Sequence, residues 1–284
     1  MQDLRSTLDV RESLASFLEE DIGTGDITSE STVPENLRAV GKIICQSRNS
    51  IVCGLEEAEI IFDICGCDAK ALLSDGARVD KGKTVMKIVG NARAILKAER
   101  TALNMMMRMS GIATETHRLT QLAKGAKILA TRKTAPGLRY FDKRAVTAGG
   151  GGAHRMRLDD MVLIKDNHLA VAGSPTDCIK KARTRVGRAL KVECEVGNTA
   201  EAIEAISAGA DIIMLDNFTP RRASSTIAEI SKMGLRKKCK IEISGGVTDK
   251  NLRHYARSKP DFISLGYITH SPRAADFSLE IVSI

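Results

Sequence analysis

The chain has 284 residues, 43% of them hydrophobic, which is enough to bury the core of one large domain or two modest ones. No window comes near ~18 consecutive apolar residues, and five acidic residues among the first twenty are unlike a secretory signal, so we expect a cytoplasmic protein without a membrane span. The net charge of +8 could suit a nucleic acid, but aromatic residues make up only 3% of the chain and leave few side chains on which bases could stack.

The first part of the chain has the pattern of a small α+β domain. Apolar residues at helical spacing predict a helix over Leu4 to Asp21. Between Val40 and Ala94, short β-rich runs surround one expected helix, Leu55 to Ile64, and Gly/Asp turns join the runs. The segment from Ala94 to Leu122 is rich in Ala, Leu and Met and lacks proline, which predicts a long connecting helix.

Most of the excess positive charge lies in one stretch, residues 121–157. It contains nine Lys and Arg residues and one acid, Asp142, so the rest of the chain balances at 34 basic and 34 acidic residues. We predict that this stretch is the anion-binding part of an active site. Within it, four consecutive glycines, Gly149 to Gly152, precede His154-Arg155 and predict a loop that approaches a ligand closely. The remaining cations Lys124, Lys127, Lys143 and Arg144 are expected to be ordinary solvated charges.

From residue 128 onward, short apolar runs alternate with helix-like segments such as 199–207, 220–233 and 248–258. Six such βα units in succession predict a parallel barrel. The expected strands are 128–131, 161–165, 191–196, 211–215, 240–244 and 261–265. The seven cysteines include no Cys-x-x-Cys pair and are expected to be reduced core thiols.

Polar residues or glycines follow all six expected strands, at the ends where a βα barrel carries its active site. One such residue is usually a helix cap, but six together are hard to explain as caps. The six ends read Thr131-Arg132-Lys133, Lys165-Asp166-Asn167-His168, Glu195, Asp216-Asn217, Ser244-Gly245-Gly246 and Gly266.

The residue types near these ends suit two kinds of chemistry. Glu195 and Asp216 are carboxylates on adjacent expected strands and could hold Mg²⁺ or accept hydrogen bonds from sugar hydroxyls. Ser244-Gly245-Gly246, with Gly266 on the next strand, is typical of a backbone phosphate cradle. The cations suited to carboxylates and phosphates are Arg132, Lys133, His154, Arg155 and Lys165.

The order and spacing of these residues resemble the quinolinate phosphoribosyltransferases, also called carboxylating nicotinate-nucleotide pyrophosphorylases. The resemblance covers nearly the whole chain. The motifs that carry it include Glu20-Asp21-Ile-Gly-Thr-Gly-Asp26, Glu99-Arg100-Thr-Ala-Leu-Asn104, Thr131-Arg-Lys-Thr134, His154-Arg155, Leu163-Ile-Lys-Asp-Asn-His168, Glu193-Cys-Glu-Val196, Met214-Leu-Asp-Asn217 and Ser244-Gly-Gly246.

The resemblance implies an α/β fold in which an N-terminal α+β open sandwich is joined to an incomplete parallel βα barrel of about six strands. We place the sandwich at residues 1–107, with 271–284 packing on it, and the barrel at 108–270. The implied reaction transfers phosphoribosyl from phosphoribosyl pyrophosphate to quinolinate with decarboxylation, giving nicotinate mononucleotide, pyrophosphate and CO₂ in NAD biosynthesis. The implied assembly is a homodimer or a higher homo-oligomer.

The resemblance also implies roles for individual residues. Arg100 would enter the neighbouring subunit's site, while Arg132, His154, Arg155 and Lys165 would hold the quinolinate dicarboxylate. Lys133, Glu195 and Asp216 would be catalytic, with the two carboxylates as Mg²⁺ ligands. The residues that would face the phosphoribosyl donor are Lys133, Glu195, Asp216, Ser244, Gly245, Gly246, Gly266 and His270.

Departures from the family pattern occur at two places. Gly152-Ala153 stands where the family often has His-Asn, and Arg157 stands where a small residue is common, which adds a charge beside the expected site. Three other functions stay open: a molybdate-transport-associated relative of the same fold, a Schiff-base aldolase or decarboxylase that uses Lys165, and a nucleic-acid-binding surface on the basic stretch.

Overall fold

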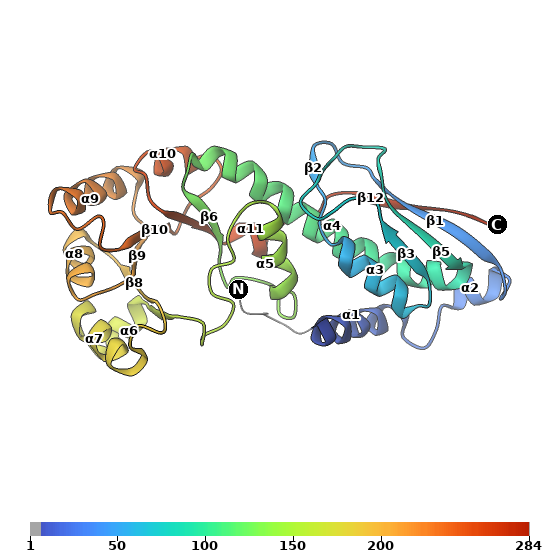
Figure 1. Cartoon of the computed structure of the whole chain (residues 1–284), viewed down its shortest axis with the longest axis horizontal. Helices are drawn as coiled ribbons and strands as arrows, with labels where there is room; N and C mark the ends of the chain where they lie inside the picture. The colour runs from blue at the N-terminus through green and yellow to red at the C-terminus, as the bar shows by residue number, and fades with distance from the viewer. Residues whose placement is uncertain (1–6, 284) are drawn as a thin grey trace. The chain divides into compact units, whose positions relative to one another are not determined.

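The computed structural model describes residues 7–283, which form two compact units. The first unit contains the described residues up to His117, together with 134–150 and 268–283, and the second contains 118–133 and 151–267. The division differs from the expected boundary at residues 107 and 108, since 134–150 belongs to the first unit. Helix α4 (Ala92–Ala123) is the long expected helix, and its residues contribute to both units (Figure 1).

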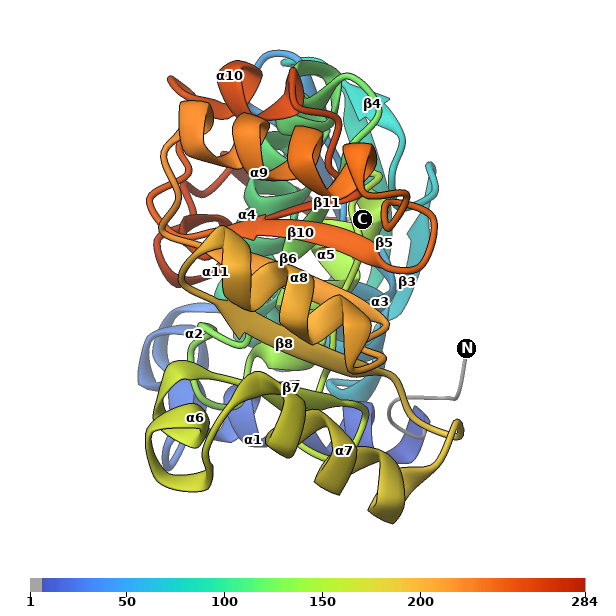
Figure 2. The same cartoon turned by 90° about the vertical axis from the view of Figure 1, so that its left-hand side faces the viewer.

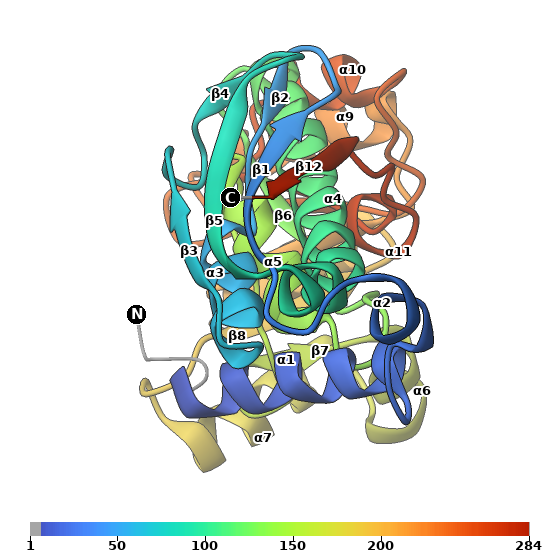
Figure 3. The same ribbon diagram turned by 90° about the vertical axis from the view of Figure 1, so that its right-hand side faces the viewer.

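A four-stranded antiparallel sheet with the order β12-β1-β5-β3 organises the first unit (Figure 3). In β1, alternate residues from Ala39 to Cys45 are buried, as expected for a strand with one covered face. The last strand returns to pair with β1, where Ile43 lies opposite Leu279. The strands are β1 (Arg38–Cys45), β3 (Asp68–Ala71), β5 (Thr84–Asn91) and β12 (Phe277–Ser283), with a separate pair β2 (Ser50–Ile51) and β4 (Arg78–Val79).

The other helices of the first unit include one that begins and ends at the expected residues, α3 (Leu55–Ile64). The expected helix at the N-terminus is confirmed as α1, while Leu4 to Ser6 lie outside the described residues. The remaining helices are α1 (Thr7–Ile22), α2 (Ile27–Thr32), α5 (Arg139–Ala148) and α11 (Tyr267–His270), whose first residue belongs to the second unit.

Six parallel strands form the sheet of the second unit, in the order β6-β11-β10-β9-β8-β7, which confirms the alternating pattern. Strands β6 and β7 stand at the two ends of this order, and helices such as α8 and α9 cover one face (Figure 2). The strands are β6 (Lys127–Ala130), β7 (Val162–Ile164), β8 (Val192–Val196), β9 (Ile212–Asp216), β10 (Lys240–Ser244) and β11 (Phe262–Leu265).

Three helices of this unit begin at side-chain caps. Ser174, Asn198 and Thr219 each accept a hydrogen bond from a backbone N–H in the first turn of the helix that follows. The caps explain why the expected starts at Thr199 and Pro220 are correct. The helices are α6 (Asp166–Ala172), α7 (Pro175–Val186), α8 (Thr199–Ser207), α9 (Pro220–Lys232) and α10 (Leu252–Ala256).

The expected helix over 248–258 is wrong in length, because α10 has only five residues. The Asn251 side chain accepts a hydrogen bond from the Thr248 N–H and donates one to the Gly246 carbonyl. These local bonds satisfy the backbone in a loop conformation and so compete with an earlier helix start.

Two further expectations concern the membrane and the cysteines. Among the described residues, no helix combines the length and hydrophobicity needed to cross a bilayer. All seven cysteines are free, and six are buried, which confirms the expectation of core thiols.

The expectation that Lys143 and Arg144 are solvated is wrong. Lys143 is buried in the first unit, and the Arg144 guanidinium contacts Glu57 at 2.6 Å and Asp75 at 2.5 Å. Asp75 also accepts hydrogen bonds from the backbone at the start of α3. Burial raises the pKa of Glu57, and Arg144 offsets that effect by stabilising the carboxylate. Arg144 is therefore part of the core of its unit, because a buried carboxylate needs a cationic partner.

Arg144→Ala should lower the free energy of unfolding by about 3–5 kcal/mol, since it leaves Glu57 buried without its partner. The measurement is the midpoint and slope of urea unfolding. Arg11→Ala is the matched control: the side chains of Arg11 and Asp63 are 46% and 66% exposed, and such pairs contribute at most about 1 kcal/mol. Equal losses in the two variants would contradict this role of Arg144.

Candidate active site

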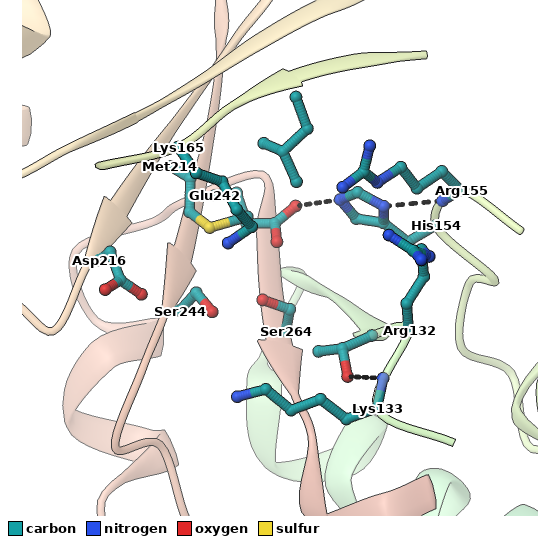
Figure 4. A pocket seen from close by; sticks show the side chains of 12 residues that line it. Arg132, Lys133, His154, Arg155, Lys165, Met214, Asp216, Glu242, Ser244 and Ser264 are labelled. Carbon is teal, nitrogen blue, oxygen red and sulfur yellow. Dashed lines mark hydrogen bonds and ion pairs between the residues drawn. The ribbon is translucent and has the colours of Figure 1, made fainter. Parts of the chain in front are cut away.

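A cavity of about 310 Å³ lies where the parallel strands of the second unit reach their C-terminal ends (Figure 4). All of its lining residues belong to that unit, so one compact body of the protein shapes it. It is lined by Thr131, Arg132, Lys133, His154, Arg155, Leu163, Lys165, Met214, Asp216, Glu242, Ser244 and Ser264.

The two-residue repeat of a β-strand explains why these side chains meet. Asp216 lies two residues after Met214 on β9, and Ser244 lies two residues after Glu242 on β10, so each pair faces the same side. The parallel register places Met214 beside Glu242 and Asp216 beside Ser244. The cavity therefore has a deeper layer and an outer layer of side chains, both supplied by neighbouring strands.

Arg132 and Arg155 form the cationic wall of the cavity. The two side chains lie near each other in Figure 4, and the Arg132 Nε is buried with no hydrogen-bond partner in the described part of the chain. Burial lowers the pKa of Arg155, and the charge of Arg132 lowers it further. Two guanidinium groups held this close favour a ligand with negative charge, because an anion offsets their mutual repulsion.

Lys165, Glu195 and Asp216 form a second charged group near the strand ends. The Lys165 Nζ donates a hydrogen bond to Glu195 at 2.5 Å, and Asp216 lines the cavity beside them. Burial and the charge of Glu195 raise the pKa of Asp216, although Lys165 and Lys133 oppose that rise. The His168 ring accepts a hydrogen bond from the Lys165 backbone N–H at 3.0 Å and so holds the end of strand β7.

The Ser244-Gly245-Gly246 turn follows the strand end for a steric reason. Gly245 has φ +82°, and a Cβ placed there would lie 2.3 Å from the Asn217 side-chain oxygen. Gly246 has φ +63° and open space around it. Only glycine fits at the first position without displacing Asn217, whose N–H donates to the Ser244 carbonyl. The turn leaves Ser244 at the cavity wall.

Two glutamates that we did not predict as site residues lie at the base of the cavity, where Glu242 is part of its lining. The His154 Nε2 lies 3.2 Å from Glu193 and 3.5 Å from Glu242, and both carboxylates are fully buried. Burial lowers the pKa of His154, but the two glutamates raise it more, to about 9. Burial, and after it the charge of Glu242, raise the pKa of Glu193, which His154 opposes.

A signal for these glutamates was present in the sequence. Glu242 interrupts the apolar run Ile241-Glu242-Ile243, and it lies two residues before the expected site residue Ser244. Glu193 has the same relation to Glu195. A side chain two residues before a site residue on a strand faces the same interior. The two-residue alternation along a strand could therefore have identified Glu193 and Glu242 as site residues.

The remaining residues that we predicted at the site lie in both units of the chain. Glu195 contacts Lys165, and Gly245, Gly246 and Gly266 directly follow strands β10 and β11. Arg100 and His270 belong to the first unit, where Arg100 is exposed on α4 and the His270 ring lies 2.7 Å from the Ser271 hydroxyl.

The two departures from the family pattern are explained by local contacts. Gly152 pairs with β6, because its N–H donates to the Ile128 carbonyl and its own carbonyl accepts from the Ala130 N–H. Arg157 is exposed and pairs with Asp159 at 3.0 Å. Neither residue lines the cavity.

Comparisons with known proteins match this chain along nearly its whole length. The family models of the quinolinate phosphoribosyl transferase N-terminal and C-terminal domains match residues 26–110 and 112–280. The probable nicotinate-nucleotide pyrophosphorylase [carboxylating] of Methanothermobacter thermautotrophicus is 40% identical over 272 residues, which cover 94% of this chain and 97% of the relative. The protein of the same description from Methanocaldococcus jannaschii is 42% identical over 275 residues, with 95% and 96% covered.

Solved structures agree with the sequence relatives. The nicotinate-nucleotide pyrophosphorylase from Francisella tularensis superposes with a TM-score of 0.90 at 35% identity and covers 98% of each chain. Both domain models match in order, and the relatives align over nearly their full lengths. The chain therefore belongs to the quinolinate phosphoribosyltransferase family.

Proposed function

We propose that the protein transfers phosphoribosyl from phosphoribosyl pyrophosphate to quinolinate and releases CO₂ and pyrophosphate, forming nicotinate mononucleotide for NAD biosynthesis. One observation carries the proposal: a single cavity joins two close guanidinium groups, Arg132 and Arg155, to the charged group of Lys165, Glu195 and Asp216. The first part suits a small dicarboxylate, and the second suits a ribose with its diphosphate.

The charges match the demands of the reaction. Breaking the bond to pyrophosphate builds positive charge on the ribose, which Asp216 and Glu195 stabilise, and negative charge on the leaving group, which Lys133 stabilises. Arg132, Arg155 and Lys165 hold the quinolinate carboxylates. Once the ring nitrogen carries the ribose, its positive charge stabilises the electron pair that stays on the ring carbon when the C–CO₂ bond breaks, and a proton from water then takes the place of the carboxylate. The protein therefore needs to position and desolvate its substrates, and no covalent nucleophile is required.

The proposal includes Mg²⁺, held by Glu195 and Asp216. The residues fit a divalent cation, because Glu195 raises the pKa of the neighbouring Asp216 and a cation would offset the repulsion between the two carboxylates. When bound with the diphosphate, Mg²⁺ would supply charge neutralisation for the leaving group. The Ser244-Gly245-Gly246 turn and Gly266 would lie against the phosphates, and we assign His270 to the donor as well.

The alternative functions have less support. The Lys165 Nζ is engaged in a 2.5 Å ion pair with Glu195, whereas a Schiff base requires an amine that is free to attack a carbonyl. Two cations of the basic stretch are not free on the surface, because Lys143 is buried and Arg144 is paired with Glu57, which leaves a smaller surface for a nucleic acid. The relatives that align along the chain are described as carboxylating pyrophosphorylases, which favours that enzyme over a transport-associated relative.

Purified protein supplied with quinolinate, phosphoribosyl pyrophosphate and Mg²⁺ should release CO₂ and form nicotinate mononucleotide. The products are measured by trapping labelled CO₂ and by chromatography of the nucleotide. Nicotinate, which lacks the 2-carboxylate, should react far more slowly because it offers the guanidinium groups one carboxylate fewer. No product, or equal turnover of the two acids, would refute the proposed reaction.

Arg132→Ala should raise the KM for quinolinate about 10- to 100-fold, the loss expected for a charge-assisted hydrogen bond of about 1.5–3 kcal/mol. Glu195→Ala should instead lower kcat, because it removes stabilisation of charge that develops during transfer. Steady-state kinetics with each substrate varied separates these effects. Lys124→Ala is the control, as an exposed cation of the same basic stretch, and should change neither constant. The reverse pattern, with kcat lost in the arginine variant and KM raised in the glutamate variant, would contradict the proposed roles of Arg132 and Glu195.

We also propose a cytoplasmic homodimer or larger homo-oligomer in which Arg100 completes the partner's site. At a quinolinate concentration far below the KM of the variants, Arg100→Ala and Arg132→Ala should each have little activity alone, and their mixture should reach about a quarter of the activity of the unsubstituted protein. Random exchange makes half of the dimers mixed, and each mixed dimer has one intact site. Native mass spectrometry checks that subunits exchange. Exchange without recovered activity would show that Arg100 is not shared between subunits.

A further inference from the structure

The His154 ring has both of its nitrogens occupied by the protein itself. Nδ1 accepts a hydrogen bond from the Arg155 backbone N–H at 2.7 Å, and Nε2 faces the carboxylates of Glu193 and Glu242 (Figure 4). An imidazole has only these two polar atoms. The protein therefore positions the ring at both of its nitrogens, and the ring lines the cavity.

The segment that carries His154 and Arg155 is anchored on both sides. Before it, Gly152 exchanges backbone hydrogen bonds with β6. After it, the backbone N–H groups of Met156 and Arg157 donate to Asp160. Between these anchors, His154 has φ +50°, a conformation that residues with a Cβ adopt infrequently. The contact of its ring with the two glutamates holds the segment at this point.

The positions of the two glutamates are unfavourable for negatively charged side chains. Glu193 on β8 and Glu242 on β10 are separated by strand β9 and are fully buried beneath a cavity that we assign to an anion. A buried carboxylate is strongly disfavoured unless a partner stabilises it, and it also repels an anionic ligand. The His154 ring lies within ion-pair distance of both. The arrangement thus holds the ring between the two carboxylates and the Arg155 backbone.

We propose that Glu193 and Glu242 are positioning residues that act through His154: they hold the ring, and the ring holds the Arg155 backbone so that its guanidinium faces the cavity. The inference rests on the proposed function, in which Arg155 binds a quinolinate carboxylate. In this arrangement the substrate meets the guanidinium groups of Arg132 and Arg155, and His154 sets the direction of the second one.

A double-mutant cycle tests this chain of contacts. Glu242→Leu removes one carboxylate that holds the ring, and should weaken quinolinate binding about tenfold when Arg155 is present. In an Arg155→Ala background the same change should have less than about a twofold effect, because no guanidinium is left to position. Binding is measured by calorimetry without the second substrate and, in parallel, as the KM for quinolinate. The KM for phosphoribosyl pyrophosphate should stay the same.

Glu242→Gln is the matched variant, because it keeps the size of the side chain and an acceptor oxygen that faces Nε2. It should restore most of the quinolinate affinity that Glu242→Leu loses, and it guards against a leucine variant that folds poorly. Equal weakening by Glu242→Leu in both backgrounds would overturn the proposal, since the cluster would then act independently of Arg155. Failure of the unsubstituted protein to turn over quinolinate would instead count against the proposed function.

The cluster could also be read as a metal site, because the three ligand atoms of His154, Glu193 and Glu242 lie within 4.8 Å of one another. Metal analysis of the purified protein distinguishes the two. One tightly bound ion per chain that Glu242→Leu loses would overturn the positioning role, whereas a metal-free protein that shows the coupling between Glu242 and Arg155 would support it.

Discussion

The site depends on one geometric constraint, the alternation of side chains along parallel strands that end at a common edge. Residues two apart on a strand face the same interior, and the parallel register places such pairs side by side across β8, β9 and β10. A few strand-end positions thereby become a cavity with two layers. Glu242 and Met214 line its deeper part, while Ser244 and Asp216 line the outer part.

Buried carboxylates in this structure lie beside basic side chains. Asp142 is fully buried and receives two hydrogen bonds from Arg108, and Glu57 is held by Arg144. His154 lies within ion-pair distance of its two glutamates in the second unit. At Asp142 and Glu57 an arginine lies against a buried carboxylate, because an unpaired buried charge costs several kcal/mol. Some side chains of the basic stretch therefore stabilise the fold, and others line the cavity.

The composition of residues 121–157 does not show which of its cations line the cavity and which ones stabilise the first unit. Arg132 and Lys133 follow strand β6 and Arg155 follows the glycine run, so their places in the cavity were predictable from the strand pattern. Lys143 and Arg144 lie between them in sequence and looked like solvated charges. They belong to helix α5, which packs with the first unit, because contacts distant in sequence with Glu57 and Asp75 decide their environment.

The sequence by itself determined the six-stranded parallel sheet, the starts of helices α8 and α9, and the polar strand ends that line the cavity. These features depend on local periodicity, caps and turns, which short segments encode. Only the tertiary structure decided that segment 134–150 joins the first unit and that Glu193 and Glu242 meet at His154. Those outcomes depend on partners from separate strands and helices. The partner of a buried charge is distant in sequence and comes into contact with it only in the folded chain.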